Sequence, residues 1–128
     1  MRINLTSVFV EDTNKALKFY TEVLSFVKKT HIPEINWITV VSPDDQEGTQ
    51  LLLEPNENPI AKTYQQALFS QGIPATSFEV EDIEAEYNRL YKLGVEFTMK
   101  PTKTIGSIIA VFNDTCGNLI QIHQLVTA

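Results

Sequence analysis

Two stretches of the chain, 70 positions apart, begin with the same pattern of apolar and polar residues. Residues 7–12 read SVFVED and residues 77–82 read SFEVED. In both stretches the side chains alternate with period two, as expected of a strand with a buried face, and an aspartate follows where a helix begins. This internal similarity predicts that the chain contains two copies of one structural unit.

Both aspartates lead into segments with helical periodicity. After Asp12 the apolar residues recur at helical spacing, at Ala16, Leu17, Tyr20, Val23 and Leu24. After Asp82 the corresponding stripe consists of Ile83, Tyr87, Leu90 and Tyr91, and Gly94 is placed to end that helix. Each segment therefore predicts an amphipathic helix with one face for packing on a sheet.

Strand-like runs surround each helix. In the first copy they span residues 3–10, 26–31, 36–42 and 49–54, and in the second copy residues 76–80, 95–99, 105–113 and 118–124. The runs 36–42 and 49–54 are separated by the turn-rich sequence PDDQEG, so we expect them to form a hairpin. After a loop at residues 55–60, a short helix is expected to have Pro59 at its first position and an apolar stripe of Tyr64, Ala67 and Leu68.

These elements predict an α+β fold built from two βαβββ repeats. The first repeat covers about residues 1–54, the second about residues 75–128, and a loop and short helix at about 55–74 connect them. A chain of 128 residues has the usual length of one domain and can bury a core without disulfides. We therefore expect a single domain over residues 1–128.

Composition and charge narrow the range of partners. The formal net charge is −6 and no cluster of Lys and Arg offsets it, so we expect no binding to nucleic acid. No apolar run reaches the length of a membrane span or of a signal peptide, which indicates a cytoplasmic protein without a membrane partner. The single cysteine, Cys116, agrees with a reducing compartment, and we expect it to be exposed in the turn DTCGN.

Three segments of the chain carry a resemblance to a known family. Residues 8–26 read VFVEDTNKALKFYTEVLSF, residues 77–97 read SFEVEDIEAEYNRLYKLGVEF, and residues 112–122 read FNDTCGNLIQI. Together they resemble the vicinal oxygen chelate superfamily, which includes glyoxalase I, bleomycin-resistance proteins and extradiol dioxygenases. The resemblance implies that the repeats curve their sheets around a ligand-binding cleft, with the helices outside, and that two chains form a homodimer.

The resemblance also implies where a divalent metal would be held, because relatives typically use His or Glu on the first and last strand of each repeat. Carried over by position, the four ligand positions are Leu5, Glu54, Ala75 and Gln121. Leucine and alanine have no donor atom and a glutamine amide is a weak neutral ligand, whereas a catalytic divalent ion needs about three protein ligands. We therefore expect no metal cofactor at this position, with a bound divalent metal as the alternative.

Strand parity gives an independent view of the expected cleft. Alternate residues of a strand point to opposite faces, and one face of the first and last strand of each repeat consists almost entirely of β-branched or aliphatic residues. The opposite face mixes polar and apolar side chains: Leu5, Ser7, Phe9, Gln50, Leu52 and Glu54 in the first repeat, and Ala75, Ser77, Glu79, Gln121 and His123 in the second. Such a mixture is typical of an apolar pocket with a few polar groups.

Glu54 is the candidate catalytic residue. A carboxylate in an apolar cleft can act as a general base or anchor a ligand, but Glu54 stands at a strand end before Pro55, where a solvated side chain is equally consistent. His123 is a candidate base or replacement metal ligand, with a solvated side chain near the C-terminus as its alternative. Trp37 is a candidate platform for a planar ligand, with packing in the core or at an interface as its alternative, and His31 is expected on the surface.

The leading functional hypothesis is a member of the resembled superfamily that binds a small, partly apolar molecule without the usual metal. The alternative is a metal-dependent lyase, isomerase or dioxygenase that uses an atypical set of Glu54, Gln121 and His123. Metal-free acid–base catalysis by Glu54 and a pure interaction role are two further hypotheses. The sequence identifies neither the ligand nor a reaction.

Overall fold

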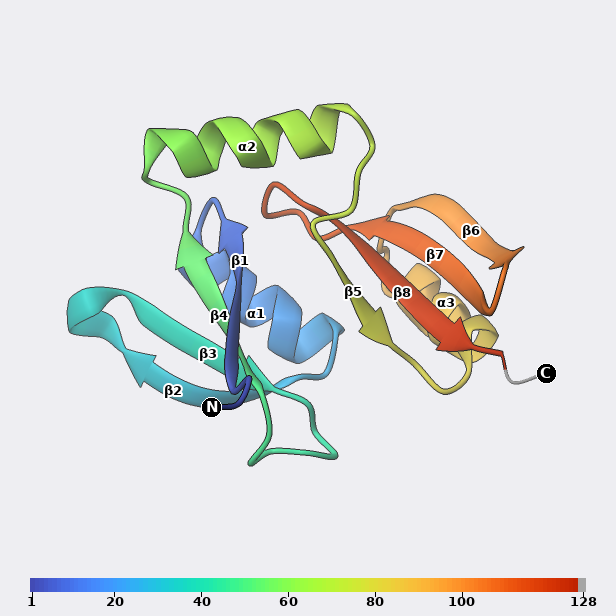
Figure 1. The fold of residues 1–128 in the computed structure, drawn as a ribbon, viewed down its shortest axis with the longest axis horizontal. Coiled ribbons are helices and arrows are strands. Elements are labelled where there is room, and N and C mark those ends of the chain that lie inside the picture. Colours follow the sequence, from blue (N-terminus) through green and yellow to red (C-terminus); the bar gives the residue numbers. More distant parts are fainter. Residues whose placement is uncertain (127–128) are drawn as a thin grey trace. The chain divides into compact units, whose positions relative to one another are not determined.

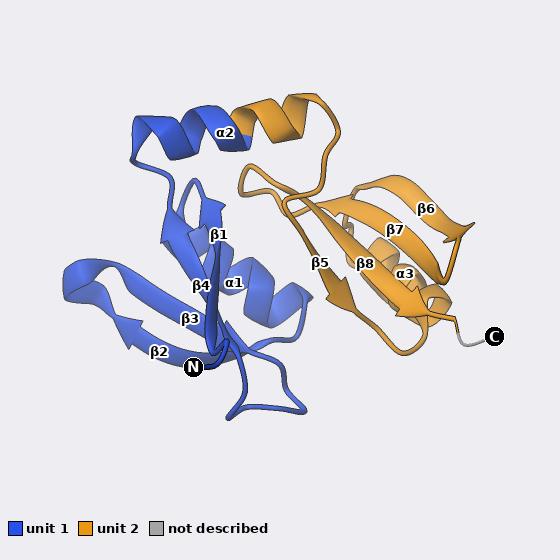
Figure 2. Cartoon of the chain, viewed as in Figure 1, with its two compact units in different colours: residues 1–65 blue, residues 66–128 orange. Residues whose placement is uncertain are grey.

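The computed structural model describes residues 1–126, which form two four-stranded sheets (Figure 1). The chain divides into two compact units, residues 1–65 and residues 66–128 (Figure 2). Each unit contains one strand, a helix and three further strands, and the two sheets have the same topology. The predicted α+β class and the internal repeat are therefore confirmed.

The first unit contains the first repeat. Its elements are β1 (Leu5–Val10), α1 (Thr13–Lys18), a π-helical turn (Phe19–Val23), β2 (Val27–Ile32), a 3-10 turn (Pro33–Ile35), β3 (Trp37–Val41) and β4 (Gln50–Pro55). The strand order is β1-β4-β3-β2, in which β1 and β4 are parallel and the other pairs antiparallel. The predicted hairpin is β3 and β4, with Thr39 opposite Leu52. The helix α1 packs against these two strands.

The second unit repeats this plan. Its elements are β5 (Thr76–Glu79), α3 (Ile83–Lys92), β6 (Phe97–Thr104), β7 (Ser107–Asn113) and β8 (Leu119–Leu125). The order β5-β8-β7-β6 again pairs the first and last strands in parallel, and α3 packs against β6, β7 and β8. The strand expected from residue 105 begins at Ser107 instead, because Gly106 turns the chain with a φ of +82°.

Both predicted helix caps are present. The carboxylate of Asp12 accepts hydrogen bonds from the backbone N–H groups of Asn14 and Lys15, at 3.0 and 3.1 Å. The carboxylate of Asp82 accepts one from the N–H of Ala85, at 3.1 Å. These bonds satisfy donors that have no partner inside a helix, which explains why each helix begins directly after its aspartate.

One face of each sheet forms a core with the helix of its own repeat. In the first unit the buried side chains include Val8, Val10, Ile38, Val40 and Leu53 of the sheet and Ala16 and Tyr20 of the helical segment. In the second they include Ala110, Phe112, Ile120 and Ile122 of the sheet and Ile83 and Leu90 of α3. Each buried large apolar side chain contributes about 1.5–3 kcal/mol. These buried faces hold the helices on the sheets, as the alternation of side chains along the strands predicted.

The connecting helix differs from the prediction. Helix α2 spans Pro59–Ser70 and starts at the predicted proline, but its buried residues are Ala61 and Gln65 rather than the expected apolar stripe. Tyr64 is 59% exposed and so is not a core residue. On α3 the predicted core residue Tyr91 is likewise exposed, at 65%. Both predictions are wrong because helical spacing alone does not fix which of two adjacent stripes faces the protein.

The turn DTCGN is built around a buried carboxylate. Asp114 accepts hydrogen bonds from the backbone N–H groups of Cys116 and Asn118 at 2.7 and 3.0 Å, and from the side-chain amide of Asn118 at 2.8 Å. This arrangement draws the turn inward, and Cys116 is only 1% exposed. The expectation of an exposed cysteine is therefore wrong.

Candidate functional site

The strand register of the first unit gathers the residues predicted for the site on one face of the sheet. Side chains at paired positions of parallel strands point to the same side. In β1 and β4 the pairs are Leu5 with Gln50, Ser7 with Leu52 and Phe9 with Glu54. Thr39 of β3 pairs with Leu52, so Trp37, two residues earlier, belongs to the same face.

In the second unit the predicted residues also share a face. Ser77 of β5 pairs with Gln121 of β8, and Glu79 pairs with His123. Ala75 lies just before β5, where its backbone N–H donates to the carbonyl of Leu119 at 2.8 Å. The strand parity inferred from the sequence is therefore correct in both repeats.

The register also shows that Glu54 and Gln121 are not equivalent positions. Ser7 and Ser77 correspond in the repeated sequence, and their parallel neighbours are Leu52 and Gln121. The register equivalent of Glu54 is therefore His123, two residues further along β8. The assignment of Gln121 as the counterpart of Glu54 followed the end of the sequence motif, which does not contain the pairing between strands.

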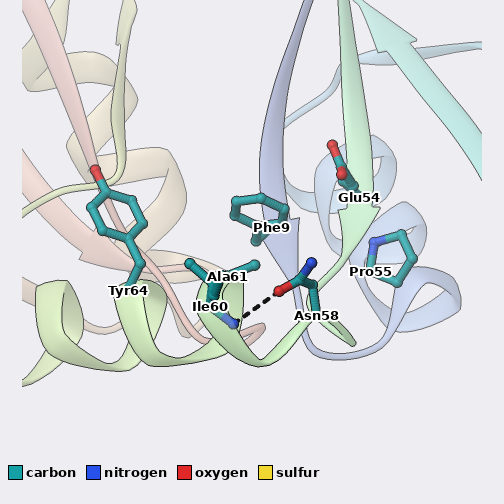
Figure 3. A pocket seen from close by; sticks show the side chains of 7 residues that line it. All are labelled: Phe9, Glu54, Pro55, Asn58, Ile60, Ala61 and Tyr64. Carbon is teal, nitrogen blue, oxygen red and sulfur yellow. Dashed lines mark hydrogen bonds between the residues drawn. The ribbon is translucent and has the colours of Figure 1, made fainter.

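A pocket of about 330 Å³ opens beside Glu54 within the first unit (Figure 3). This volume lies in the range typical of sites for small molecules. The lining residues come from the ends of β1 and β4, the following loop and the first turns of α2: Phe9, Glu54, Pro55, Asn58, Ile60, Ala61 and Tyr64.

The walls of the pocket are held by a few hydrogen bonds. The side chain of Asn58 accepts from the backbone N–H of Ile60 at 2.9 Å, which places the first turn of α2 beside the strand ends. Further along α2, the buried amide of Gln65 donates to the backbone carbonyl of Phe9 at 2.8 Å and accepts from the side chain of Asn56 at 2.7 Å. Gln65 thereby attaches the helix directly to β1.

The pocket combines apolar and aromatic surface with one ionisable carboxylate. Figure 3 shows the ring of Phe9 and the carboxylate of Glu54 projecting from neighbouring strands, with Ile60 and Tyr64 on α2. Ile60 and Tyr64 are exposed, at 81% and 59%, and Glu54 is half-buried. Such a wall can bind an apolar ring system and offer a charged acceptor to a hydrogen-bond donor.

A second polar group of residues lies on the sheet of the second unit. The hydroxyl oxygen of Ser77 is 2.6 Å from Nδ1 of His123, and the amide of Gln121 donates to the same hydroxyl at 3.0 Å. All three side chains are half-buried. The structure thus brings three predicted site residues into one hydrogen-bonded chain.

The residues at the metal positions implied by the resemblance do not fit a divalent ion. Leu5 and Ala75 carry no donor atom, and the amide nitrogen of Gln121 is already hydrogen-bonded to Ser77. Of these four residues only Glu54 has the chemistry of a strong ligand, and Nδ1 of His123, the register equivalent of Glu54, already contacts the hydroxyl of Ser77. Within residues 1–126, no group of three or more His, Cys, Asp and Glu side chains is arranged to hold a metal.

The pocket unites two of the residues predicted for the site, Phe9 and Glu54, with five that were not assigned to it from the sequence. Those five lie in the segment interpreted as a loop and connecting helix: Pro55, Asn58, Ile60, Ala61 and Tyr64. One indication in the sequence that these residues lie near Glu54 is that only four residues separate Glu54 from the helix start at Pro59. Trp37 is half-buried, Leu5 is 42% exposed, and neither lines this pocket, while His31 is exposed as predicted.

The repeated βαβββ topology and the sequence together define the class of protein. The sequence model of the Glyoxalase/Bleomycin resistance protein/Dioxygenase superfamily matches residues 2–122. The chain belongs to this superfamily, as the resemblance implied. None of the helices formed by the described residues has the length and hydrophobicity of a membrane span.

Individual relatives match over almost their whole length. The chain is 61% identical to YurT of Bacillus subtilis (strain 168), an alignment that covers 97% of this chain and 99% of YurT. Among solved structures, UcmS2 is 28% identical with a TM-score of 0.81, covering 96% of this chain and 97% of that one. TnmS3, described as an antibiotic binding protein from Streptomyces sp. CB03234, shares the fold at 24% identity, with a TM-score of 0.75 and coverage of 98% and 97%.

Proposed function

We propose that this protein binds a small, partly apolar molecule in the pocket beside Glu54, without the divalent metal of many relatives. The observation that carries the proposal is the composition of that pocket, which is lined by Phe9, Ile60 and Tyr64 together with a single carboxylate. The apolar side chains favour a ligand with a ring or hydrocarbon surface. Glu54 favours a ligand that also has a positive charge or a hydrogen-bond donor.

The exposure of the apolar wall supports a binding role. Ile60 and Tyr64 leave much of their surface in water although they belong to a helix that buries other residues. Covering such surface with a ligand gains about 25 cal/mol for each Å² of apolar area removed from water. The helix is held by the Gln65 bridge to β1, so the wall is pre-formed and little ordering is required on binding.

The fold is compatible with this role, because TnmS3 is described as binding an antibiotic. That likeness extends to the fold alone, so the ligand class proposed for this chain depends on its own pocket residues. Leu5 and Ala75 have no donor atom for a metal, and this is the reason for proposing that no metal takes part.

The proposal is tested by titrating fluorescent probes of different charge. We expect a protonated aminoacridine, which is aromatic and cationic, to bind the wild-type protein more tightly than the anionic dye anilinonaphthalene sulfonate. Glu54→Gln should weaken aminoacridine binding about tenfold, because a charge-assisted hydrogen bond is lost. The same variant should leave the affinity for a neutral phenylnaphthylamine nearly unchanged.

Two further variants control this experiment. Glu57→Gln removes a carboxylate of the same loop that is exposed and does not line the pocket, and it should leave aminoacridine binding unchanged. Tyr64→Ala should weaken both aromatic probes, since the ring is part of the wall. Equal losses in Glu54→Gln and Glu57→Gln would show that general negative charge, not this pocket, attracts the cation.

Metal removal separates the proposal from its alternative. After dialysis against a chelator, the affinity for aminoacridine should be the same as before, because no step of binding uses a metal. A loss of binding that Zn²⁺ or Mn²⁺ restores would instead favour a metal-dependent protein with an atypical ligand set.

The proposal includes the homodimer that the resemblance implies. Several large apolar side chains are exposed on the described chain, among them Ile3, Ile35 and Leu125, and a second chain can cover such residues. Light scattering should then report twice the chain mass of 14.5 kDa. A mass of one chain at micromolar concentration would remove the dimer and leave the pocket proposal unaffected.

A further inference from the structure

The hydrogen-bonded chain of Ser77, Gln121 and His123 belongs to the second unit and shares no residue with the pocket beside Glu54. It lies on β5 and β8 of the second unit, and all three side chains are half-buried, so they remain partly open to solvent. Their arrangement is the feature that suggests chemistry, since a serine and a histidine within hydrogen-bonding distance are the two parts of an activated nucleophile.

The direction of the hydrogen bonds decides what the serine does. The amide of Gln121 donates to the hydroxyl oxygen of Ser77 at 3.0 Å. The remaining short contact, 2.6 Å from that oxygen to Nδ1 of His123, is then filled by the serine's own proton when the imidazole is neutral and carries its hydrogen on Nε2. In that tautomer Ser77 donates its proton to the imidazole nitrogen that can act as its base.

Gln121 supplies the third component. A glutamine amide nitrogen has two hydrogens, and only the one given to Ser77 has a hydrogen-bond acceptor among residues 1–126. The second hydrogen belongs to a group 3.0 Å from the serine oxygen. That places a donor close to where a carbonyl oxygen would lie after its carbon became bonded to Ser77.

We propose that Ser77 is an acyl-accepting nucleophile, with His123 as its general base and Gln121 as the donor to the developing oxyanion. The substrate class is small, activated carboxylic esters, whose leaving groups need little further assistance. This is a second activity site, and it stands whether or not the pocket beside Glu54 binds a ligand.

The proposed reaction is a balanced ester hydrolysis in two steps. The oxygen of Ser77 forms a bond to the ester carbonyl carbon while its proton passes to Nδ1 of His123, and the leaving alcohol departs with that proton. Water then attacks the acyl-serine, again giving a proton to His123, which returns it to Ser77 as the carboxylic acid is released. The sum is ester plus water giving acid plus alcohol.

The first repeat provides a matched control inside the same chain. Ser7 occupies the position equivalent to Ser77, but its parallel neighbour is Leu52, and the residue two positions further along β4 is Glu54 rather than a histidine. Ser7 is exposed and makes no hydrogen bond of this kind among the described residues. The proposal therefore predicts reactivity at Ser77 and none at Ser7.

The test is acylation of the full chain by p-nitrophenyl acetate. Release of p-nitrophenol should show a burst, and peptide mass spectrometry should find one acetyl group on Ser77. Ser77→Ala should lose the burst and the adduct, whereas Ser7→Ala should keep both. Gln121→Ala should slow acylation by about 10²-fold, the effect of losing one oxyanion donor.

His123→Gln keeps a polar side chain of similar reach but cannot take a proton, so it separates catalysis from structure. We expect it to slow acylation of Ser77 by about 10²-fold or more while its urea unfolding midpoint stays close to that of the wild type. An adduct on Ser77 that forms equally fast in His123→Gln, or the absence of any adduct on Ser77 in the wild-type protein, would overturn the proposal.

Discussion

The two repeats have the same backbone plan and different chemistry at equivalent positions. In the first repeat Ser7 lies beside Leu52 and Phe9 beside Glu54, which gives an apolar surface with one carboxylate. In the second repeat Ser77 lies beside Gln121 and Glu79 beside His123, which gives a hydrogen-bonded polar surface. Side chains at a few outward strand positions therefore decide what each repeat offers to a ligand, while the shared fold does not.

The loops that precede the last strand of each repeat differ in the same way. The connection between β7 and β8 folds around the buried Asp114, whereas the connection between β3 and β4 is mostly exposed and carries Asp44 at its surface. One loop is thus part of the core of its unit and the other is not.

The largest expected effect comes from these loops. Asp114→Ala removes the acceptor of three hydrogen bonds and leaves the buried amide of Asn118 without that partner, so it should lower the free energy of unfolding by about 3 kcal/mol or more. Asp44→Ala should change it by about 0.5 kcal/mol or less. Urea unfolding followed by circular dichroism measures both, and similar losses for the two variants would remove the distinction between the loops.

An intermediate effect is expected where α2 is attached to β1. Gln65→Leu breaks the bonds to the carbonyl of Phe9 and to Asn56, so it should lower the free energy of unfolding by about 2 kcal/mol. It should also weaken aminoacridine binding, because the helix forms one wall of the pocket. Gln66→Leu changes the exposed neighbouring position and is the control. Unchanged probe affinity in Gln65→Leu would show that the pocket does not depend on this bridge.

The smallest effect concerns the equivalent helix caps. Asp12→Ala and Asp82→Ala should each lower the free energy of unfolding by about 1 kcal/mol. The loss should be larger for Asp12, whose carboxylate accepts two backbone hydrogen bonds, than for Asp82, which accepts one. A larger loss for Asp82→Ala in the same unfolding experiment would contradict the explanation by hydrogen bonds.

The features that could be predicted from the sequence are those set by local periodicity. The repeat, the helix starts after Asp12 and Asp82, and the face to which each strand residue belongs all follow from spacing within short segments. The family resemblance is confirmed as well, since its motif residues include these caps and the turn around Asp114.

The remaining features depend on contacts between segments that are distant in sequence. The register that makes His123 the equivalent of Glu54 is a relation between strands, and the short contact of His123 with Ser77 follows from it. The rotation of α2 that exposes Tyr64 is set by the bond from Gln65 to Phe9, which no helical pattern contains. Only two of the seven residues that line the pocket, Phe9 and Glu54, were therefore predicted from the sequence.

The most direct test of the central claim, that the first unit carries the ligand pocket, is nuclear magnetic resonance of the ¹⁵N-labelled protein during titration with aminoacridine. The claim predicts that shifted backbone amides concentrate around Phe9, Glu54, Ala61 and Tyr64, and that Glu54→Gln reduces these shifts at equal probe concentration. Shifts confined to residues 76–125, or no saturable shifts at all, would contradict the claim.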